Sequence, residues 1–145
     1  MLRILVALDG SNHSERAVRH MVKLKDELRE RLEVLLLNVQ LPVPMRELLF
    51  DGRPSELHRL EEPLKEHGKR LLEPARAALE AAAIECRTCV EIGAPAEVIA
   101  RFAASYHCEM IVMGTRGQGA VAALCLGSVP AKVVHLAAVP VLLVP

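Results

Sequence analysis

Short apolar runs alternate along the chain with longer stretches in which apolar residues recur at helical spacing. Five segments have the length and composition of strands: Leu2–Leu8, Leu32–Val39, Ile84–Ile92, Glu109–Met113 and Val139–Val144. The first is followed at once by Asp9 and Gly10, which predicts a buried strand that ends in a turn. Ile84–Ile92 is more polar than the others, so we expect it at an edge of the sheet.

The stretches between these segments predict amphipathic helices. Ser11 or Asn12 can cap the first helix, which carries apolar residues on one face. Pro95 is well placed to open a helix that ends near Tyr106, and Val129–Leu136 predicts a last helix before the final strand.

A longer helical pattern runs from Ser55 to Ala83, after a proline-containing segment that we interpret as a loop. Pro63 and Pro74 lie inside this pattern. Proline removes a backbone donor and crowds the preceding turn, so a kink or a break is expected.

This order of elements predicts an α/β fold. Strands that alternate with helices form a parallel sheet with right-handed crossovers and helices on both faces. No internal repeat or linker interrupts the pattern, so we expect residues 1–145 to form a single doubly wound domain.

Composition narrows the classes of function. The chain has 18 basic and 18 acidic residues, so its formal net charge of zero gives no general attraction to nucleic acid or to an anionic membrane. No apolar run reaches the roughly 18 residues that cross a bilayer, and Asp9 closes the first run without a signal-peptide cleavage site. We therefore expect a cytoplasmic protein with reduced cysteines.

The glycine-bearing segment after the fourth strand carries the candidate chemistry. In a doubly wound sheet, ligands bind beyond the carboxyl ends of the strands, where the winding reverses. Gly114, Gly117 and Gly119 allow close approach of the backbone, and Gly127 with Ser128 opens a helix whose free amides attract phosphate. This predicts a phosphate site, although neither common phosphate-binding fingerprint is present. The alternative is that these glycines only shape a loop and cap a helix.

The spacing Gly114-x2-Gly117-x9-Gly127-Ser128 resembles the ATP-binding signature of the universal stress protein family. The resemblance extends along the whole chain, through Ile4–Ser11, Gly93–Pro95, Ile111–Gly117 and Val139–Val144. It implies a five-stranded parallel sheet of order 3-2-1-4-5 and a site for ATP, with ADP or AMP as alternatives. It also implies Mg²⁺ or Mn²⁺ bound through the phosphates.

The resemblance assigns roles to individual residues. It places Ala7, Leu8 and Asp9 beside adenine and ribose, with the Asp9 carboxylate accepting a ribose hydroxyl, and Val39 against adenine through its backbone. It assigns the phosphates to Met113, Gly114, Arg116 and Gly117 at the inner end and to Gly127, Ser128 and Val129 at the outer end. Where related ATP-binding chains often carry a hydroxyl residue, this chain has Pro130, which lacks both a hydroxyl and an amide.

The apolar segment Val139–Val144 is predicted to form an exposed sheet edge, which antiparallel pairing with a second copy would cover. Members of the family commonly dimerise in this way, so we expect a homodimer. Fast nucleotide hydrolysis would need a positioned base and an activated water, and Asp9 is already assigned to ribose. We therefore expect a sensor or regulator with slow or no hydrolysis. The alternative is a dimeric interaction module of the same fold that binds no nucleotide, which Pro130 favours.

Some other residues have side chains that could react or bind a ligand, but simpler interpretations are available for them. Cys86 and Cys89 have the spacing of a redox pair, yet within a strand they point to opposite faces, which favours a structural role. His13 is either at the edge of the ligand or a solvated helix residue. Asp9 has two interpretations, as a helix cap or as a ribose ligand. A flavodoxin-like redox domain is disfavoured because only 2% of the residues are aromatic.

Overall fold

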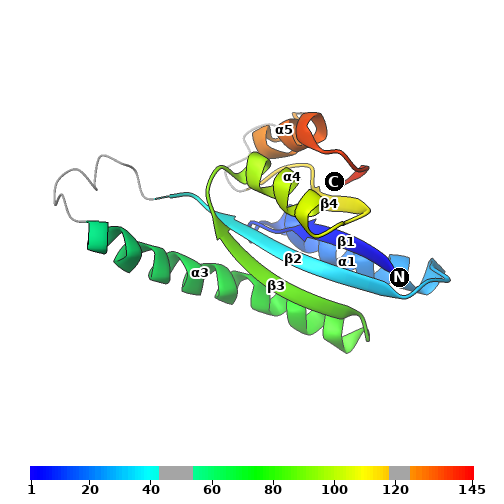
Figure 1. Cartoon of the computed structure of the whole chain (residues 1–145). Helices are drawn as coiled ribbons and strands as arrows, with labels where there is room; N and C mark the ends of the chain where they lie inside the picture. The colour runs from blue at the N-terminus through cyan, green and yellow to red at the C-terminus, as the bar shows by residue number, and fades with distance from the viewer. Residues whose placement is uncertain (43–53, 118–124) are drawn as a thin grey trace.

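The structure is a computed structural model that describes residues 1–42, 54–117 and 125–145, with the backbone alone for residues 54–60. These residues form five strands and four helices. In chain order they are β1 (Leu2–Ala7), α1 (Asn12–Glu27), β2 (Leu32–Gln40), α3 (Pro54–Ala81), β3 (Glu85–Ile92), α4 (Pro95–Ser105), β4 (Met110–Gly114), α5 (Ser128–Leu136) and β5 (Val141–Val144), as drawn in Figure 1.

The five strands form one parallel sheet of order β3-β2-β1-β4-β5. This confirms the predicted α/β class, the order 3-2-1-4-5 and the position of β3 at an edge. The central strand β1 pairs with β2 on one side and with β4 on the other, so that Leu5 lies opposite both Leu35 and Ile111. The winding reverses between β1 and β4, and a ligand is expected at their carboxyl ends.

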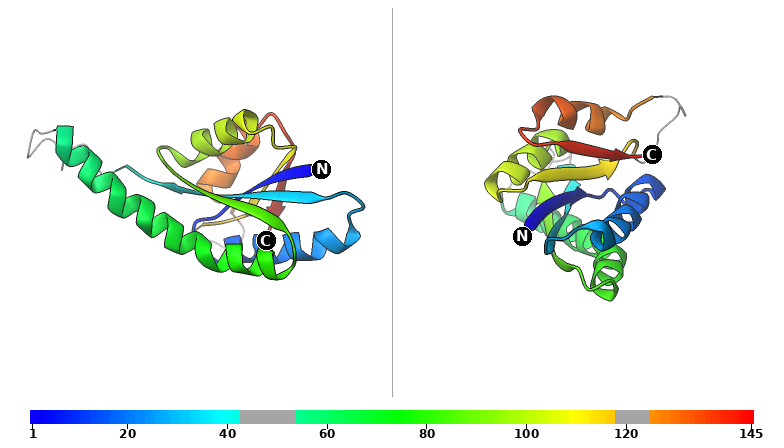
Figure 2. Two further views of the ribbon diagram at one scale, coloured as in Figure 1. Left: turned by 60° about the horizontal axis from the view of Figure 1, so that its bottom comes forward. Right: turned by 90° about the vertical axis from the view of Figure 1, so that its right-hand side faces the viewer.

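Helices cover both faces of the sheet, as Figure 2 shows. Because side chains alternate along a strand, Ile4 and Val6 of β1 pack toward α1 and α3, where they meet Met21. Leu5 of β1 packs on the opposite face, where Phe102 of α4 lies. The apolar runs of the central strands are therefore buried on both sides, as is usual in parallel sheets.

The turn after β1 places the start of α1. The Ser11 hydroxyl accepts a hydrogen bond from the Ser14 amide at 3.2 Å, and the Ser14 hydroxyl donates to the Ser11 carbonyl at 2.9 Å. Ser11 is therefore the capping residue of the two that the sequence left open, and Asn12 is the first residue of the helix.

Helix α3 runs without a break through Pro63 and Pro74, so of the expected kink or break, the break is wrong. Each proline removes one backbone donor, while the helix stays anchored to the sheet by the buried side chains of Leu72 and Leu79. At Gly68 the helix comes so close to β3 that an added Cβ would lie 2.5 Å from Val90 Cγ1. The loop expected before α3 lies largely outside the described residues, as does Gly119.

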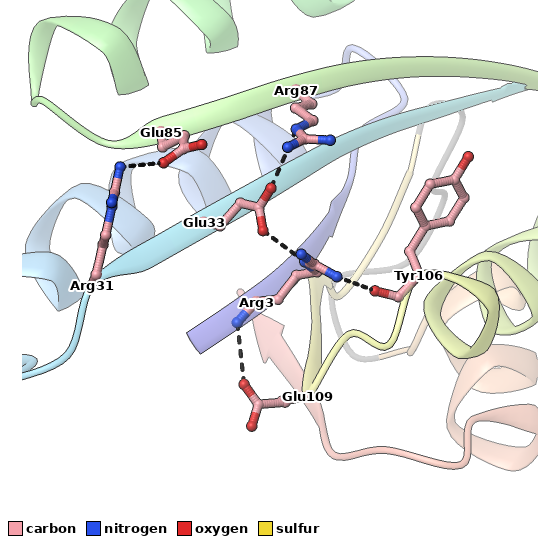
Figure 3. Close-up of polar contacts among 7 residues, drawn as sticks. All are labelled: Arg3, Arg31, Glu33, Glu85, Arg87, Tyr106 and Glu109. Carbon is pink, nitrogen blue, oxygen red and sulfur yellow. Dashed lines mark hydrogen bonds and ion pairs between the residues drawn. The ribbon is translucent and has the colours of Figure 1, made fainter. Parts of the chain in front are cut away.

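A charged cluster closes the amino end of the sheet (Figure 3). The Glu33 side chain is 1% exposed, and its two oxygens lie 2.7 Å from Arg3 Nε and 3.3 Å from Arg87 Nε. Arg3 also donates from Nη1 to the Tyr106 carbonyl at 2.9 Å and from its amide to Glu109 at 3.2 Å. A buried carboxylate is tolerated only when it is paired in this way, and the cluster ties β1, β2, β3 and the end of α4 together.

Two further sequence expectations concern the cysteines and the membrane. Cys86 packs with the cluster under α1 and α3, whereas Cys89 packs with the cluster under α4 and α5, which confirms that the two thiols face opposite sides of β3. Burial raises the pKa of both thiols, as suits a structural role.

Within the described ranges, no helix is both long and apolar enough to cross a bilayer.

Candidate functional site

A cavity of about 390 Å³ opens at the carboxyl ends of β1 and β4 and reaches the first turn of α5. Every residue that the sequence proposes for the nucleotide lines this cavity: Ala7, Leu8, Asp9, Val39, Met113, Gly114, Arg116, Gly117, Gly127, Ser128 and Val129. The segments that carry them are far apart in sequence and meet because β1 and β4 are neighbours in the sheet. Their role in binding stays a prediction.

The sequence missed part of the cavity wall. Leu37, Ile99, Pro95 and Ser14 also line it, as does Pro130. Leu37 could have been found, since it lies two residues before Val39 and so on the same face of β2. The contribution of α4 through Pro95 and Ile99 depends on how the helix sits over the sheet, which no local pattern specifies.

One side of the cavity is apolar and closely packed. Leu37 is fully buried, Ile99 is 3% exposed and Met113 is 6% exposed, and Ala7 adds a small side chain between the strands. Small-molecule sites are commonly lined by such apolar groups with a few placed polar ones. This wall suits a flat, uncharged ring.

Backbone contacts to β2 fix the segment that follows β1. The Leu8 amide donates to the Leu37 carbonyl at 2.9 Å. The Leu8 carbonyl accepts a hydrogen bond of 2.8 Å from Asn38 Nδ2, and Asn38 is 2% exposed. Gln40 Nε2 donates in turn to Asn38 Oδ1 at 2.6 Å. The buried amide of Asn38 therefore holds the position from which Asp9 enters the cavity.

Asp9 contributes to the turn and lines the cavity at the same time. Its Oδ1 accepts a hydrogen bond of 2.9 Å from the Ser11 amide, two residues along, as aspartates in turns often do. Its other oxygen faces Gly117, where an added Cβ would lie 2.3 Å from Oδ2. Ser11 and not Asp9 caps the helix, so the interpretation of Asp9 as the helix cap is wrong; Asp9 supports the turn before α1, and its role as a ribose ligand stays a prediction.

Gly114 is required by a contact with α1. A Cβ on Gly114 would lie 2.7 Å from His13 Cβ and 2.9 Å from the His13 carbonyl carbon. His13 is packed against the end of β4 and is absent from the cavity lining, and its buried Nδ1 has no hydrogen-bond partner in the described part of the chain. The close approach of α1 to β4 thus explains this glycine without a ligand.

The segment after β4 is joined to the start of α5. The Thr115 carbonyl accepts a hydrogen bond of 2.8 Å from the Gly127 amide, and the Thr115 amide donates to the Val144 carbonyl at 3.0 Å. This arrangement directs the first turn of α5, which begins at Ser128, toward the cavity. A helix start offers unpaired amides and the positive end of the helix dipole, which together attract anions.

Asp9 and Arg116 are the charged residues among the described residues of the cavity wall, and their formal charges cancel. Among the described residues there is no group of three or more His, Cys, Asp or Glu side chains that could hold a metal ion. A divalent cation bound through the phosphates of a ligand stays a prediction.

Comparisons with known proteins address the identity of the fold and the family. The model of the universal stress protein family matches residues 1–145. The universal stress protein encoded beside the QAH/OAS sulfhydrylase region of Thermus aquaticus is 36% identical over 142 residues, which cover 97% of this chain and 96% of that protein.

Solved structures show the same fold. The protein MJ0577 of Methanocaldococcus jannaschii aligns with a TM-score of 0.81 at 28% identity, over 98% of this chain and 94% of that one. A universal stress protein of Arabidopsis thaliana with AMP bound aligns with a TM-score of 0.71 at 21% identity, over 99% and 91% of the two chains. The match of the family along the whole sequence, together with these relatives, shows that the chain belongs to the universal stress protein family.

Proposed function

We propose that this chain binds an adenine nucleotide in the cavity at the carboxyl ends of β1 and β4 and acts as a sensor or regulator. One observation carries the proposal: the residues that the signature assigns to the nucleotide all line one cavity. ATP is the ligand that the resemblance implies, with ADP and AMP as alternatives. The volume of about 390 Å³ falls in the range of small-molecule sites.

The two ends of the cavity suit the two ends of a nucleotide. Leu37, Ile99 and Met113 would enclose the adenine ring, and the Asp9 carboxylate lies between this wall and the phosphate end, where a ribose hydroxyl could donate to it. The amides at Gly117 and Ser128 would face the phosphates. The AMP that the Arabidopsis thaliana protein holds makes adenine nucleotides the class to test first.

We propose slow or no hydrolysis. A general base must lie within hydrogen-bond reach of the attacking water, and Asp9 is the one carboxylate in the described lining. Its Oδ1 already accepts from the Ser11 amide, and its role in this proposal is to hold the ribose.

The test is titration calorimetry with ATP, ADP and AMP, each with and without Mg²⁺. Gly127→Val is the informative variant, because even a Cβ there would lie 3.2 Å from Arg116 Cα and 3.3 Å from the Thr115 carbonyl oxygen. We expect this variant to fold but to lose most of its affinity, with Gly127→Ala between it and the wild type. Unchanged affinity in Gly127→Val would remove this residue from the site, and no binding of any nucleotide at millimolar concentration would end the proposal.

A homodimer through β5 is part of the proposal. β5 is an edge strand with half-buried residues, and Val134 and Leu136 of the adjacent α5 are both 48% exposed. Exposed apolar surface beside an unpaired strand edge favours association with a second copy. Sedimentation at micromolar concentration should give a dimer mass. The double variant Val134→Lys, Leu136→Lys should shift it toward the monomer, whereas Ala77→Lys on the exposed side of α3 should not.

The competing function is a dimeric interaction module that binds no nucleotide, and Pro130 in the cavity wall is the observation that favours it. Nucleotide that copurifies with the protein, detected by mass spectrometry after denaturation, separates the two. The cytoplasmic location expected from the sequence stays a prediction, which cell fractionation tests.

A further inference from the structure

Pro130 lies in the first turn of α5, where it is buried and lines the cavity. The first amides of a helix have no partner within the helix and are the groups that can bind an anion. Here, however, the Gly127 amide is already bonded to the Thr115 carbonyl at 2.8 Å, and the Ala131 amide to the Gly127 carbonyl at 3.0 Å. Pro130 has no amide hydrogen at all.

The donors left at this helix start are therefore few. They are the amides of Ser128 and Val129 and the Ser128 hydroxyl, none of which has a partner in the described residues. The pyrrolidine ring of Pro130 also fills the space beside Gly127, since a Cβ on that glycine would lie 3.3 Å from Pro130 Cδ. Another residue at position 130 would offer a backbone N–H to the ligand, whereas the proline ring offers only apolar carbon atoms.

In the part of the opposite wall that the structure describes, the Thr115 amide is used by the Val144 carbonyl, while Arg116 and Gly117 line the cavity. Arg116 is the one cation in the described lining, where Asp9 is the one carboxylate.

The two ends of this wall offer different groups to a nucleotide. The one phosphate of a monophosphate would lie at the inner end, where the resemblance places Arg116 and Gly117. A triphosphate would bring two further charged groups to the start of α5, where few donors remain and Pro130 supplies none. Groups that are desolvated without partners lower the affinity.

We propose that Pro130 makes this site selective for an adenine nucleoside monophosphate over the triphosphate. The inference rests on the proposed function and narrows its ligand. It follows from the donors that this chain offers in the first turn of α5, and it assigns a specificity-determining role to one residue of the wall.

The test compares the affinities of AMP, ADP and ATP by calorimetry at one ionic strength, with and without Mg²⁺, for the wild type and two variants. In the wild type we expect AMP to bind about tenfold or more tightly than ATP, because a charged group without its partner costs at least that much. Pro130→Ser restores an amide and adds a hydroxyl, so it should tighten ATP by about tenfold while AMP changes by less than about twofold. Pro130→Ala restores the amide alone and should fall between them.

The outcomes are distinguishable. Tighter or equal binding of ATP by the wild type overturns the selectivity and leaves the proposed adenine-nucleotide site standing. An equal gain for AMP and ATP in Pro130→Ser overturns the role of Pro130. The absence of binding by all three nucleotides overturns the proposed function itself, and the selectivity with it. Thermal melting of each variant confirms that the affinities are measured on folded protein.

Discussion

The carboxylate of Asp9 lies directly against the backbone of Gly117, so that a Cβ on the glycine would be 2.3 Å from Asp9 Oδ2. This contact joins the end of β1 to the segment that follows β4. The atom in the way belongs to the tip of a side chain, which can move, whereas the glycine belongs to the backbone. A larger residue at position 117 would therefore displace Asp9.

We predict that Gly117→Ala weakens nucleotide binding and changes stability little. The new methyl group should push the Asp9 carboxylate away and break its hydrogen bond to the Ser11 amide. The loss of one such bond costs about 0.5–1.5 kcal/mol of unfolding free energy, while the ribose would lose its acceptor. Calorimetry and urea denaturation measure the two effects.

A double-mutant cycle with Asp9→Ala isolates this contact. Once the carboxylate is removed, Gly117→Ala should cause no further loss of affinity, because among the described residues only Asp9 lies within contact of the added Cβ. Additive losses in the double variant would mean that Gly117 acts on the ligand independently of Asp9.

Gly114→Ala should have the opposite profile and lower the stability. Here the added Cβ would meet the His13 carbonyl carbon at 2.9 Å, so a backbone element of α1 has to move. Overpacking of this kind typically costs about 1–3 kcal/mol. The free energy of unfolding from urea denaturation, compared with that of Gly117→Ala, checks the difference. Equal stability of the two variants would contradict the prediction.

Asn38→Leu should destabilise the protein by about 1–3 kcal/mol, because it leaves the Leu8 carbonyl buried without its donor. Gln40→Ala is the control, since it removes only a half-buried partner of the Asn38 side chain. Nucleotide affinity should fall in Asn38→Leu as well, since Asp9 follows Leu8 directly. A cost no larger than that of Gln40→Ala would show that Asn38 does not position this segment.

The thiol of Cys108 predicts a pH dependence. Burial raises the pKa of Cys108 to about 11, above its ordinary value, so folding favours the neutral thiol. Its contribution to stability is present in full below about pH 9, the ordinary value from which the pKa is raised, and is lost as the pH rises through about 11.

The measurement is the free energy of unfolding between pH 7 and pH 11 for the wild type and for Cys108→Ala. The wild type should lose up to roughly 2 kcal/mol more than the variant over this range, at about 1.4 kcal/mol per pKa unit. Cys125→Ala, at an exposed position, should follow the wild type. Parallel curves for the wild type and Cys108→Ala would exclude the effect.

The order of elements was predictable because each strand and helix carries its own local signal. The boundaries of these elements also depend on contacts between elements. β5 starts at Val141 and not at Val139. Pro140 precedes it and has no N–H to donate, so only its carbonyl bonds to β4, where it accepts a hydrogen bond from the Ile111 amide. α3 continues through its prolines because the packing of Leu72 and Leu79 on the sheet outweighs two missing hydrogen bonds.

Site residues that directly follow the end of a strand could be predicted from the sequence. Site residues that reach the cavity through the packing of a helix on the sheet could not. Asp9 and Gly114 follow directly from the rule on parallel sheets. Ile99 lies in the wall only because α4 crosses above β2 and β4, and the pairing of Glu33 with Arg3 and Arg87 joins residues that no sequence spacing relates.

Strand β1 carries Arg3 with its buried partner near one end and is followed by Asp9 at the other. Six residues of extended chain separate them by about 20 Å, and the charges at the Arg3 end are already paired with one another. The two charged centres therefore affect each other only weakly. Salt or an arriving anion can alter the ligand end of the strand, while the ion pairs that lock its other end keep their energy.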